Sequence, residues 1–267
     1  MKSYEESYKY LITPKTYIIV RCDGKNFSKY TSKLVKPFDD ELADAMYETA
    51  IALCKEFNAK FAYTQSDEIS LVITDIGDNP DTQPILGNVL QKLCSLTASV
   101  ATAKFNEVRN LQYINSLIDD IKSFGKVTNV VLPKQAYFDA RVFVVPNADE
   151  VINHMIWRQQ DATRNSVSMA AHALLGHNAT MNLSGEEKQE KMFQDKDVNW
   201  NDYPTKYKRG VVISKKTILK DVINPTDMDC NSEPEVLSVT RSKWMVDFEI
   251  PIFTKDKQYL FDLIPIK

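Results

Sequence analysis

The amino-acid sequence predicts an α+β protein built on one antiparallel sheet. Short runs rich in β-branched and aromatic residues alternate with two long stretches of helical periodicity, in the order β-α-β-β-α-β. That order is the split βαβ, or ferredoxin-like, pattern. Of the 267 residues, 43% are hydrophobic and 26% are charged, which excludes a collagen, a coiled coil and a largely disordered chain.

The first half of the chain supplies three strands and one helix. The nearly continuous apolar run TYIIVRC predicts a strand at 16–22. Pro37 disfavours helix at the residue before it, so a helix should begin beyond it, with Asp39 or Asp40 as its N-cap, and run to Asn58. Two apolar segments, 60–64 and 69–74, flank four polar residues and predict a hairpin.

The second half begins with a further helix and strand and then becomes mainly helical. We expect a helix at 85–105, a looser segment to about 136, and a fourth strand at 138–145 that Pro146 closes. Helices are predicted at 150–175 and 186–193. An aromatic, polar loop at 199–213 leads into a strand, and residues from about 219 to 267 carry Pro225, Pro234 and Pro251 and some strand-like runs.

Two aspartates should meet at one edge of this sheet. In the ferredoxin-like order the third strand lies between the first and the second, so Asp23 and Asp67 come side by side. Two neighbouring carboxylates repel each other unless one takes up a proton or a cation lies between them, and oxygen ligands favour a hard ion such as Mg²⁺. The carbonyl of Gly24 is a further candidate ligand. Glu68 is either a third carboxylate of the site or points to the other face of its strand.

The residues around this pair indicate phosphate chemistry. The backbone N–H groups of residues 24–28 form a candidate cradle for a triphosphate. Carboxylates that hold two metal ions about 3.5–4 Å apart are typical of nucleotidyl transfer. The alternative is structural, because aspartates beside glycine at strand ends are common turn residues.

Charge and cysteine content exclude several other classes. The net charge of −3 gives no general attraction to nucleic acid, so such a contact needs a local patch. Residues 206–220 hold six basic residues and no acidic one, and are the best candidate for contact with RNA phosphates, although lysines also protect exposed strand edges. Four separated cysteines without a CxxC pair argue against a disulfide scaffold or a zinc site. No apolar run spans a membrane or forms a signal core, so we expect a cytoplasmic protein.

Motifs for other enzyme classes are missing from the sequence. There is no GxSxG context for a serine hydrolase and no P-loop for a nucleoside triphosphatase. The three histidines, His154, His172 and His177, show no metal-ligand spacing with any cysteine, and we interpret them as structural.

Five sequence blocks carry a resemblance to a known family. They are Arg21-Cys22-Asp23-Gly24-Lys25-Asn26-Phe27 with Lys36-Pro37, Ala62-Tyr63-Thr64-Gln65-Ser66-Asp67-Glu68, Phe138-Asp139-Ala140-Arg141-Val142, Trp157-Arg158-Gln159-Gln160-Asp161, and Asn199-Trp200-Asn201 with Tyr207-Lys208-Arg209-Gly210. In this order they resemble the tRNA(His) guanylyltransferases and the Thg1-like 3′-to-5′ polymerases. The resemblance covers about residues 4–213.

The resemblance implies a polymerase palm at 1–146, with residues 147–267 as a helical and C-terminal extension packed on it as one unit. It implies Asp23 and Asp67 as catalytic residues that hold two Mg²⁺ ions, with Gly24 as a backbone ligand. The implied nucleotide-binding residues are Asp23, Gly24, Lys25, Asn26, Phe27, Ser28, Lys36, Ser66, Asp67 and Lys92. ATP or GTP would activate a tRNA 5′-monophosphate, an incoming nucleoside triphosphate would be added to it, and the protein would be a homotetramer.

Further residues were assigned to RNA contact. Trp200 and Tyr207 are candidates to stack on an unpaired base, and the other candidates are Arg158, Asn201, Lys208 and Arg209. For Arg158 the competing interpretation is a local ion pair with Asp161, three residues further along one helix. For Arg141 the choice lies between a nucleotide and Asp139, and for Lys92 between phosphate and solvent.

One departure from the family pattern favours one branch. Eukaryotic members carry His-Ile-Asn-Asn after the Trp-Arg-Gln block, where this chain has Thr163-Arg164-Asn165-Ser166. The lost histidine favours template-dependent repair of tRNA 5′ ends over untemplated addition of G to tRNA(His). The alternatives are a palm-type nucleotide cyclase, which the Gln65-Ser66-Asp67-Glu68 turn argues against, and a non-catalytic RNA-binding palm, which the intact carboxylate pair argues against.

Overall fold

The computed structural model describes residues 1–77, 83–125, 130, 132–223 and 236–266. Its centre is a six-stranded antiparallel sheet in the order β4-β1-β3-β2-β5-β6. The strands are β1 (Tyr17–Gly24), β2 (Phe61–Gln65), β3 (Glu68–Ile73), β4 (Phe138–Val145), β5 (Val211–Ile223) and β6 (Val236–Asp247). Because β3 lies between β1 and β2, the predicted ferredoxin-like α+β fold is confirmed.

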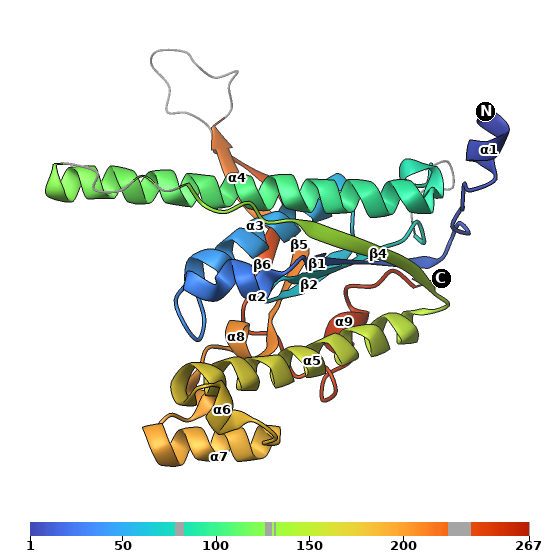
Figure 1. Cartoon of the computed structure of the whole chain (residues 1–267). Coiled ribbons are helices and arrows are strands. Elements are labelled where there is room, and N and C mark those ends of the chain that lie inside the picture. The colour runs from blue at the N-terminus through green and yellow to red at the C-terminus, as the bar shows by residue number, and fades with distance from the viewer. Residues whose placement is uncertain (78–82, 126–129, 131, 224–235, 267) are drawn as a thin grey trace.

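Helices cover both faces of this sheet. On one face lie α3 (Asp40–Glu56) and α4 (Leu90–Phe124), and on the other lies α5 (Ala148–Leu175), as Figure 1 shows. The shorter helices are α1 (Lys2–Glu6), α2 (Phe27–Tyr30), α6 (His177–Thr180), α7 (Gly185–Lys196), α8 (Thr205–Arg209) and α9 (Gln258–Phe261), with 3₁₀ turns at Thr31–Lys33, Ile85–Asn88 and Trp200–Asp202. No helix among the described residues is long and apolar enough to cross a membrane.

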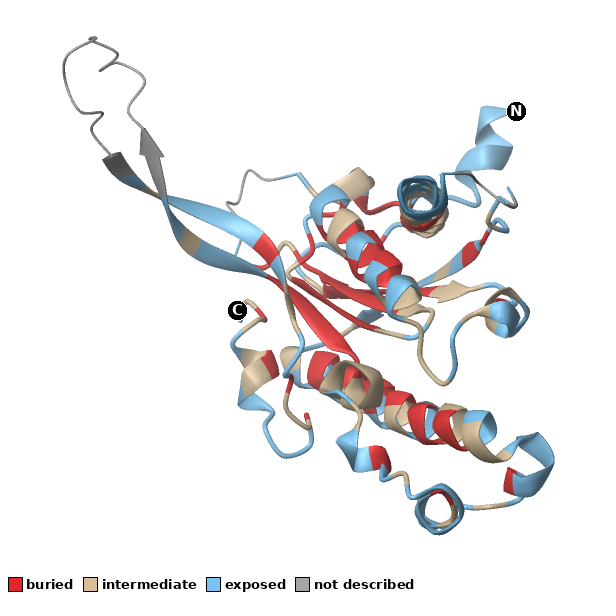
Figure 2. Ribbon diagram, turned by 90° about the vertical axis from the view of Figure 1, so that its left-hand side faces the viewer, coloured by how far each residue is buried: buried red, intermediate tan, exposed pale blue. Residues whose placement is uncertain are grey.

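The alternation of side chains along β1 divides the core into two layers. Ile18, Val20 and Cys22 point toward α3 and α4, whereas Ile19 points toward α5. All four are buried, and the sheet is therefore covered on both faces over its central strands (Figure 2). This is why β1 is nearly continuously apolar until it reaches Arg21 and Asp23.

The start of α3 is fixed by a side-chain cap. The carboxylate of Asp39 accepts a hydrogen bond from the Leu42 amide at 2.8 Å, so Asp39 is the cap and Asp40 is the first helical residue. Asp40 and Glu41 then lie in the first turn, where the helix dipole favours negative charge.

The second long helix differs from its predicted bounds. Residues 85–88 form a 3₁₀ turn, with Leu86 and Gly87 at positive φ, and α4 itself continues to Phe124. The prediction of a looser segment after residue 105 was therefore wrong. No glycine or proline interrupts residues 106–124, and Gly125, at φ 68°, ends the helix.

The chain after residue 210 returns to the sheet. Four residues of β5 pair with β2, from Phe61 opposite Ser214 to Thr64 opposite Val211. β5 then continues past β2 and pairs with β6 over twelve residues, which gives a long two-stranded ribbon. The part of the chain that was hardest to place from sequence thus extends the same sheet, while the division at residue 146 stays a prediction.

Candidate active site

The end of β1 and the β2–β3 turn meet, as the topology requires. Asp23 is the last residue but one of β1, and Asp67 lies in the two-residue turn between β2 and β3. The Gly24 amide donates a hydrogen bond to the Asp67 carbonyl at 3.1 Å and ties the two segments together. Ser66 adopts φ 53°, the left-handed conformation that such a tight turn uses.

The two aspartates differ in their electrostatic surroundings. Burial raises the pKa of Asp67 to about 6, and the negative charge of Asp23 adds to the effect. Asp23 has a cationic neighbour, since its Oδ2 lies 3.8 Å from the guanidinium of Arg141. Arg141 also pairs with Asp139 at 3.5 Å, which is the local partner considered for it from sequence. Among the described residues, no Lys or Arg forms an ion pair with Asp67.

This arrangement fits a divalent cation bound by oxygen ligands. A partly desolvated carboxylate without a cationic partner, beside a second carboxylate, is stabilised when a cation binds between them. Within the described ranges, no group of three or more His, Cys, Asp or Glu side chains could hold a metal. Backbone carbonyls such as that of Gly24, water and nucleotide phosphates would supply the other ligands, as is usual for Mg²⁺.

Glu68 is paired directly opposite Asp23, on the same face of the sheet, and its side chain reaches toward α5. Arg158 donates to it twice, from Nε to Oε1 at 2.6 Å and from Nη2 to Oε2 at 2.7 Å. Arg158 also donates to Asp161 at 2.9 Å and lies over the ring of Trp157. Burial raises the pKa of Glu68 in spite of the nearby guanidinium. Glu68 therefore lies on the same face as Asp23, but Arg158 occupies both of its carboxylate oxygens, and Glu68 anchors α5 to the sheet.

The predicted RNA contacts Arg158 and Trp200 are not available on the surface. Arg158 is 9% exposed and its guanidinium is taken up by Glu68 and Asp161. Trp200 is also buried, and its indole N–H donates to Ser166 Oγ at 3.1 Å. Burial therefore argues against both as RNA contacts. The two side chains fasten α5 to its neighbours, which the sequence motif does not reveal.

The candidate phosphate cradle is shorter than its sequence suggests. The Gly24 amide is used by Asp67, and the Lys25 amide donates to the Tyr137 carbonyl at 2.8 Å. The backbone amides of Asn26, Phe27 and Ser28, at the start of α2, lack partners within the described part of the chain.

Phe27 is a core residue that also lines a cavity beside Asp67. It is buried, and its ring packs on Tyr30, Phe105 and Phe138 with centroid distances of 5.0–5.5 Å. A Cβ atom on Gly24 would lie 2.2 Å from this ring. Gly24 is therefore required by the close approach of Phe27, whatever its carbonyl binds.

A cavity of about 610 Å³ opens beside Asp67. Its wall includes Asp67 and the predicted nucleotide-binding residues Phe27, Ser28, Lys36 and Ser66. Much of the rest of the wall is apolar and aromatic, with Phe38, Leu42, Met46, Tyr47, Met169 and Tyr207. A concave site with apolar surface for a base and polar groups for phosphates suits a nucleotide. The periodicity of α3 predicted Leu42 and Met46 as helix-face residues but not as cavity wall.

One side of the cavity is closed by contacts between α8 and the start of α3. The Tyr207 hydroxyl and the Lys206 ammonium both donate to Asp40, and hydrogen bonds from these two groups lower the pKa of Asp40. The Tyr207 ring stacks on Phe38 with a centroid distance of 4.6 Å. Tyr207 thus belongs to the cavity wall, and its partner Asp40 was missed from sequence because nothing local indicates the contact.

The remaining residues of the Asn-Trp-Asn and Tyr-Lys-Arg-Gly blocks are divided between surface and scaffold. The Lys208 ammonium donates to the exposed Asn201's carbonyl, and the Arg209 carbonyl accepts from the Tyr63 hydroxyl at 2.6 Å. Gly210, at φ 79°, allows this segment to pass close to the Thr64 carbonyl. These contacts place the start of β5 next to β2.

Lys92 lies elsewhere. It is exposed on the first turn of α4, about 20 Å along the helix axis from Phe105, which packs against Phe27. The structure of one chain therefore does not bring Lys92 to the triphosphate end, and the solvent interpretation describes it better. His154 is buried beside Phe143 and Trp157, and burial lowers its pKa to about 4, consistent with a structural histidine.

Comparisons with known proteins agree with this architecture. Residues 1–146 match the sequence model of the Thg1 family, tRNAHis guanylyltransferase. A bacterial tRNA(His) guanylyltransferase (Thg1)-like protein in complex with ATP is 38% identical, with a TM-score of 0.78 over 99% of this chain and 97% of that one. Its counterpart in complex with GTP is also 38% identical, with a TM-score of 0.73 over 98% and 96%.

A curated relative extends the match. The probable tRNA(His) guanylyltransferase of Drosophila melanogaster is 27% identical over 82% of this chain and 73% of that protein. The family model covers more than half of the chain, and the two nucleotide complexes align with nearly all of it. The chain therefore belongs to the tRNA(His) guanylyltransferase family and is a nucleotidyltransferase.

Proposed function

We propose that this protein adds nucleotides in the 3′-to-5′ direction to the 5′ end of truncated tRNA, directed by a template and dependent on Mg²⁺. ATP or GTP first transfers its nucleotidyl group to the 5′-monophosphate and releases pyrophosphate. The 3′-hydroxyl of an incoming nucleoside triphosphate then attacks the activated 5′-phosphate and displaces AMP or GMP. The observation that carries the proposal is the neighbouring Asp23 and Asp67, of which Asp67 lines a nucleotide-sized cavity, in a chain of this family.

Each part of the site has a role in this reaction. Asp23 and Asp67 would hold two Mg²⁺ ions, which supply a lowered pKa for the attacking hydroxyl and neutralise the triphosphate. Lys36 contributes positive charge, while Ser28 and Ser66 offer hydroxyl donors in the wall of the cavity. The apolar and aromatic part of the wall would accept the base and exclude water from it.

The nucleotide substrates follow from the relatives. Bacterial Thg1-like proteins have been solved with ATP and with GTP, and tRNA(His) guanylyltransferases are named for tRNA. We extend these ligands to this chain. The repair branch is favoured by Thr163-Arg164-Asn165-Ser166, where Arg164 and Asn165 both donate to Asp161 and so serve the scaffold of α5.

A homotetramer in the cytoplasm completes the proposal. Its structural support is the far half of α4, where Leu111, Ile114, Ile118, Ile121 and Phe124 are exposed. Four of these positions follow a 3-4-3 spacing, which places them on one stripe of the helix. Apolar stripes of this kind on a projecting helix are typical of protein–protein contacts.

The test uses a tRNA that lacks its first 5′ nucleotide and carries a labelled 5′-monophosphate. With Mg²⁺, ATP and the four nucleoside triphosphates, the wild type should restore the missing nucleotide according to the opposite strand. Asp67→Asn should lose at least 100-fold in rate, whereas the control Asp119→Asn, an exposed residue of α4, should keep wild-type activity.

Other outcomes of the same assay identify the alternatives. Cyclic nucleotide formed from triphosphate alone would replace the proposal with a cyclase. Tight tRNA binding without extension by the wild type would leave a non-catalytic RNA-binding palm.

A further inference from the structure

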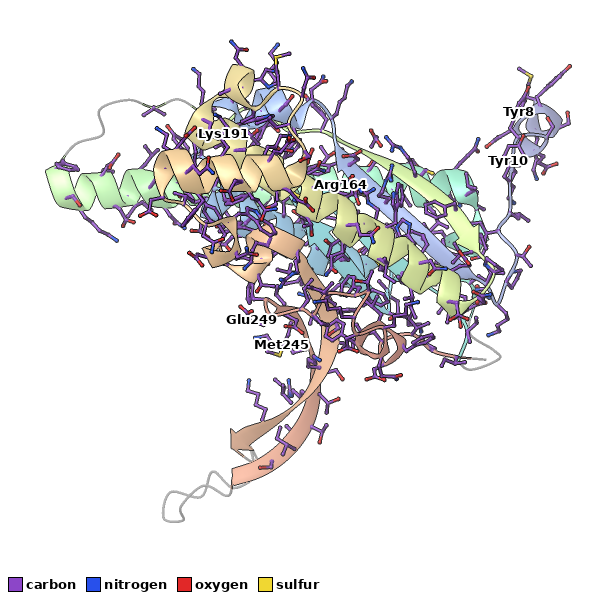
Figure 3. The ribbon with its side chains drawn as sticks, turned by 90° about the horizontal axis from the view of Figure 1, so that it is seen from below. Tyr8, Tyr10, Arg164, Lys191, Met245 and Glu249 are labelled. Carbon is purple, nitrogen blue, oxygen red and sulfur yellow. The ribbon has the colours of Figure 1, made fainter. Side chains whose placement is uncertain are left out.

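The β5–β6 ribbon projects from the body as an arm with two chemically different faces. Beyond Ser214, which is the last residue of β5 paired with β2, the ribbon has no other strand beside it within the described sheet. Figure 2 shows it as an exposed, twisted ribbon, and Met245 marks its base in Figure 3. We call its described part, 214–220 with 238–246, the arm.

One face of the arm collects four cations. Residues directly opposite each other on paired strands share a face, and every second residue returns to it. Lys216 lies opposite Lys243, Ile218 opposite Arg241, and Lys220 opposite Val239, so Lys216, Lys220, Arg241 and Lys243 share one face. All four are exposed, and none forms an ion pair with another described residue.

The other face is built for packing at its base. It carries Trp244, which is buried against the main core, and Lys215, whose ammonium lies 5.4 Å from the Trp244 ring centroid. The four cations Lys216, Lys220, Arg241 and Lys243 are therefore confined to the face opposite Trp244. They form a stripe about 13 Å long, from Lys216 to Lys220, given the usual rise along a strand.

Like charges on the cationic face repel each other and destabilise the strand pair. Lys216 and Lys243 are directly opposite, where like charges destabilise a strand pair and side chains stand only about 5 Å apart. The arm's described residues contain no acidic side chain that would offset this repulsion. A bound polyanion would, because each phosphate that meets a Lys or Arg releases condensed counterions.

The register places this face on the catalytic side of the sheet. Val212, two pairs before Lys216 on the same face, belongs to the core layer under α5, the layer toward which Glu68 points. Glu68 is directly opposite Asp23, so Asp23 and the four cations lie on one continuous face of the sheet. Because β5 starts beside Thr64, the cations lie about 17–30 Å along β5 from the catalytic end.

We propose that the arm binds the phosphate backbone of the RNA duplex whose 5′ end lies at Asp23 and Asp67. The inference rests on the proposed function, since it assumes that an RNA end occupies that site. Because an A-form RNA duplex rises by roughly 3 Å per base pair, a distance of 17–30 Å is on the order of six to ten base pairs. The arm therefore contacts the body of the stem without reading its sequence.

Edge protection is the competing explanation for lysines on an exposed strand. It requires charge on the open edges of the ribbon and does not require two lysines to face each other across it. If protection were their only role, neutralising them would promote aggregation and leave RNA affinity unchanged.

The test compares two variants of the full chain with the same change of charge. The arm variant carries Lys216→Gln, Lys220→Gln, Arg241→Gln and Lys243→Gln, and the control carries Gln at the exposed positions Lys2, Lys55, Lys255 and Lys257. Affinities are measured by fluorescence anisotropy between 50 and 200 mM salt, on a full tRNA and on a four-base-pair stem-loop.

The arm variant should bind tRNA at least 10-fold more weakly than the control variant at about 100 mM salt. The slope of log affinity against log salt should fall by about 3 to 3.5, given a loss of roughly 0.7–0.9 for each of four phosphate contacts. The short stem-loop should show no difference between the variants. Replacing Lys216, Lys220 and Lys243 by Arg should retain tRNA affinity, and ATP binding should stay as in the wild type throughout.

The outcomes separate the two proposals. Equal tRNA affinity and salt slope for the arm and control variants, with wild-type binding intact, would overturn the arm and leave the proposed function standing. The arm proposal would also be overturned if the arm variant differed from the control variant only in its oligomeric state. A wild type that binds ATP but neither tRNA nor the stem-loop would overturn both.

Discussion

Asp67 is the residue whose surroundings are least favourable to its own charge. Its pKa is raised to about 6 by burial, next to a second carboxylate. The proton is therefore bound more tightly in the folded chain than in the unfolded one, and folding stability falls as pH rises from about 4 to 6 and stays lower above that range. Because the charged carboxylate lowers folding stability at neutral pH, a cation bound to it should restore that stability.

The metal-free Asp67→Asn variant should accordingly be more stable than the wild type at pH 7.5, by about 1–2 kcal/mol after allowance for partial solvent exposure. The difference should disappear near pH 3.5, where the carboxyl is protonated in both states. Urea unfolding at the two pH values measures it. Adding Mg²⁺ should stabilise the wild type only, and equal stabilisation of both proteins would exclude Asp67 as a ligand.

Gly24 allows a second prediction for a single residue. A Cβ at this position would lie 2.2 Å from the ring of Phe27, which cannot move freely among three other aromatic rings. Gly24→Ala should therefore cost about 2–3 kcal/mol of folding stability. Gly185→Ala is the matched control, since its Cβ would meet nothing within 4 Å. If both variants unfold at the wild-type urea midpoint, the packing argument is wrong.

At the scale of elements, α5 is held to the sheet by an ion pair in a largely buried position. Glu68 and Arg158 are about 15% and 10% exposed, and their two hydrogen bonds connect β3 with α5. Removing one partner leaves the other charge without compensation, whereas removing both does not.

We expect Glu68→Gln to cost about 2–4 kcal/mol and the double variant Glu68→Leu/Arg158→Met to be more stable than either corresponding single variant. A double-mutant cycle by urea unfolding measures the coupling. Additive costs would show that the pair does not connect the two elements. Because this role is structural, tRNA affinity per folded molecule should not change.

The elements also show where sequence patterns are informative. The alternation and composition of β1, the hairpin around Asp67 and the β-α-β-β-α-β order sufficed to predict which strand ends meet. They did not predict α4 beyond residue 105, where the helix carries apolar residues that are exposed and lie outside the core. They also missed the Asp40–Tyr207 contact, which joins residues 167 positions apart.

For the whole molecule, the same far half of α4 leads to a prediction about assembly. A helix that presents Ile114 and Ile118 to solvent loses apolar burial that a second copy would supply. Ile114→Lys with Ile118→Lys should reduce the mass in solution, measured by light scattering, while leaving the helical circular dichroism intact. The control pair Ser116→Lys and Asp120→Lys lies on other exposed positions of the helix and should not change the mass.

Sequence reasoning placed RNA contact at residues whose motifs are shared within the family, and two of these proved to be buried. Arg158 and Trp200 are prominent in sequence because they fasten α5, a constraint that a motif cannot distinguish from ligand binding. Sequence patterns did not indicate Arg241 and Lys243 of β6 as candidate RNA contacts, because only the register with β5 brings them beside Lys216.

The ribbon's attachment at one end makes its length an adjustable dimension of the molecule. β5 shares four residue pairs with β2 and twelve with β6, so residues added near the free end disturb no pairing with the palm. Adding two residues to each strand would extend the reach by about 6.6 Å and keep each side chain on its original face, whereas adding one would turn every later side chain over. The ribbon can therefore be lengthened only by an even number of residues per strand if its side chains are to keep their faces. Such a change would alter the distance to a distal contact and leave the chemistry at Asp67 unchanged.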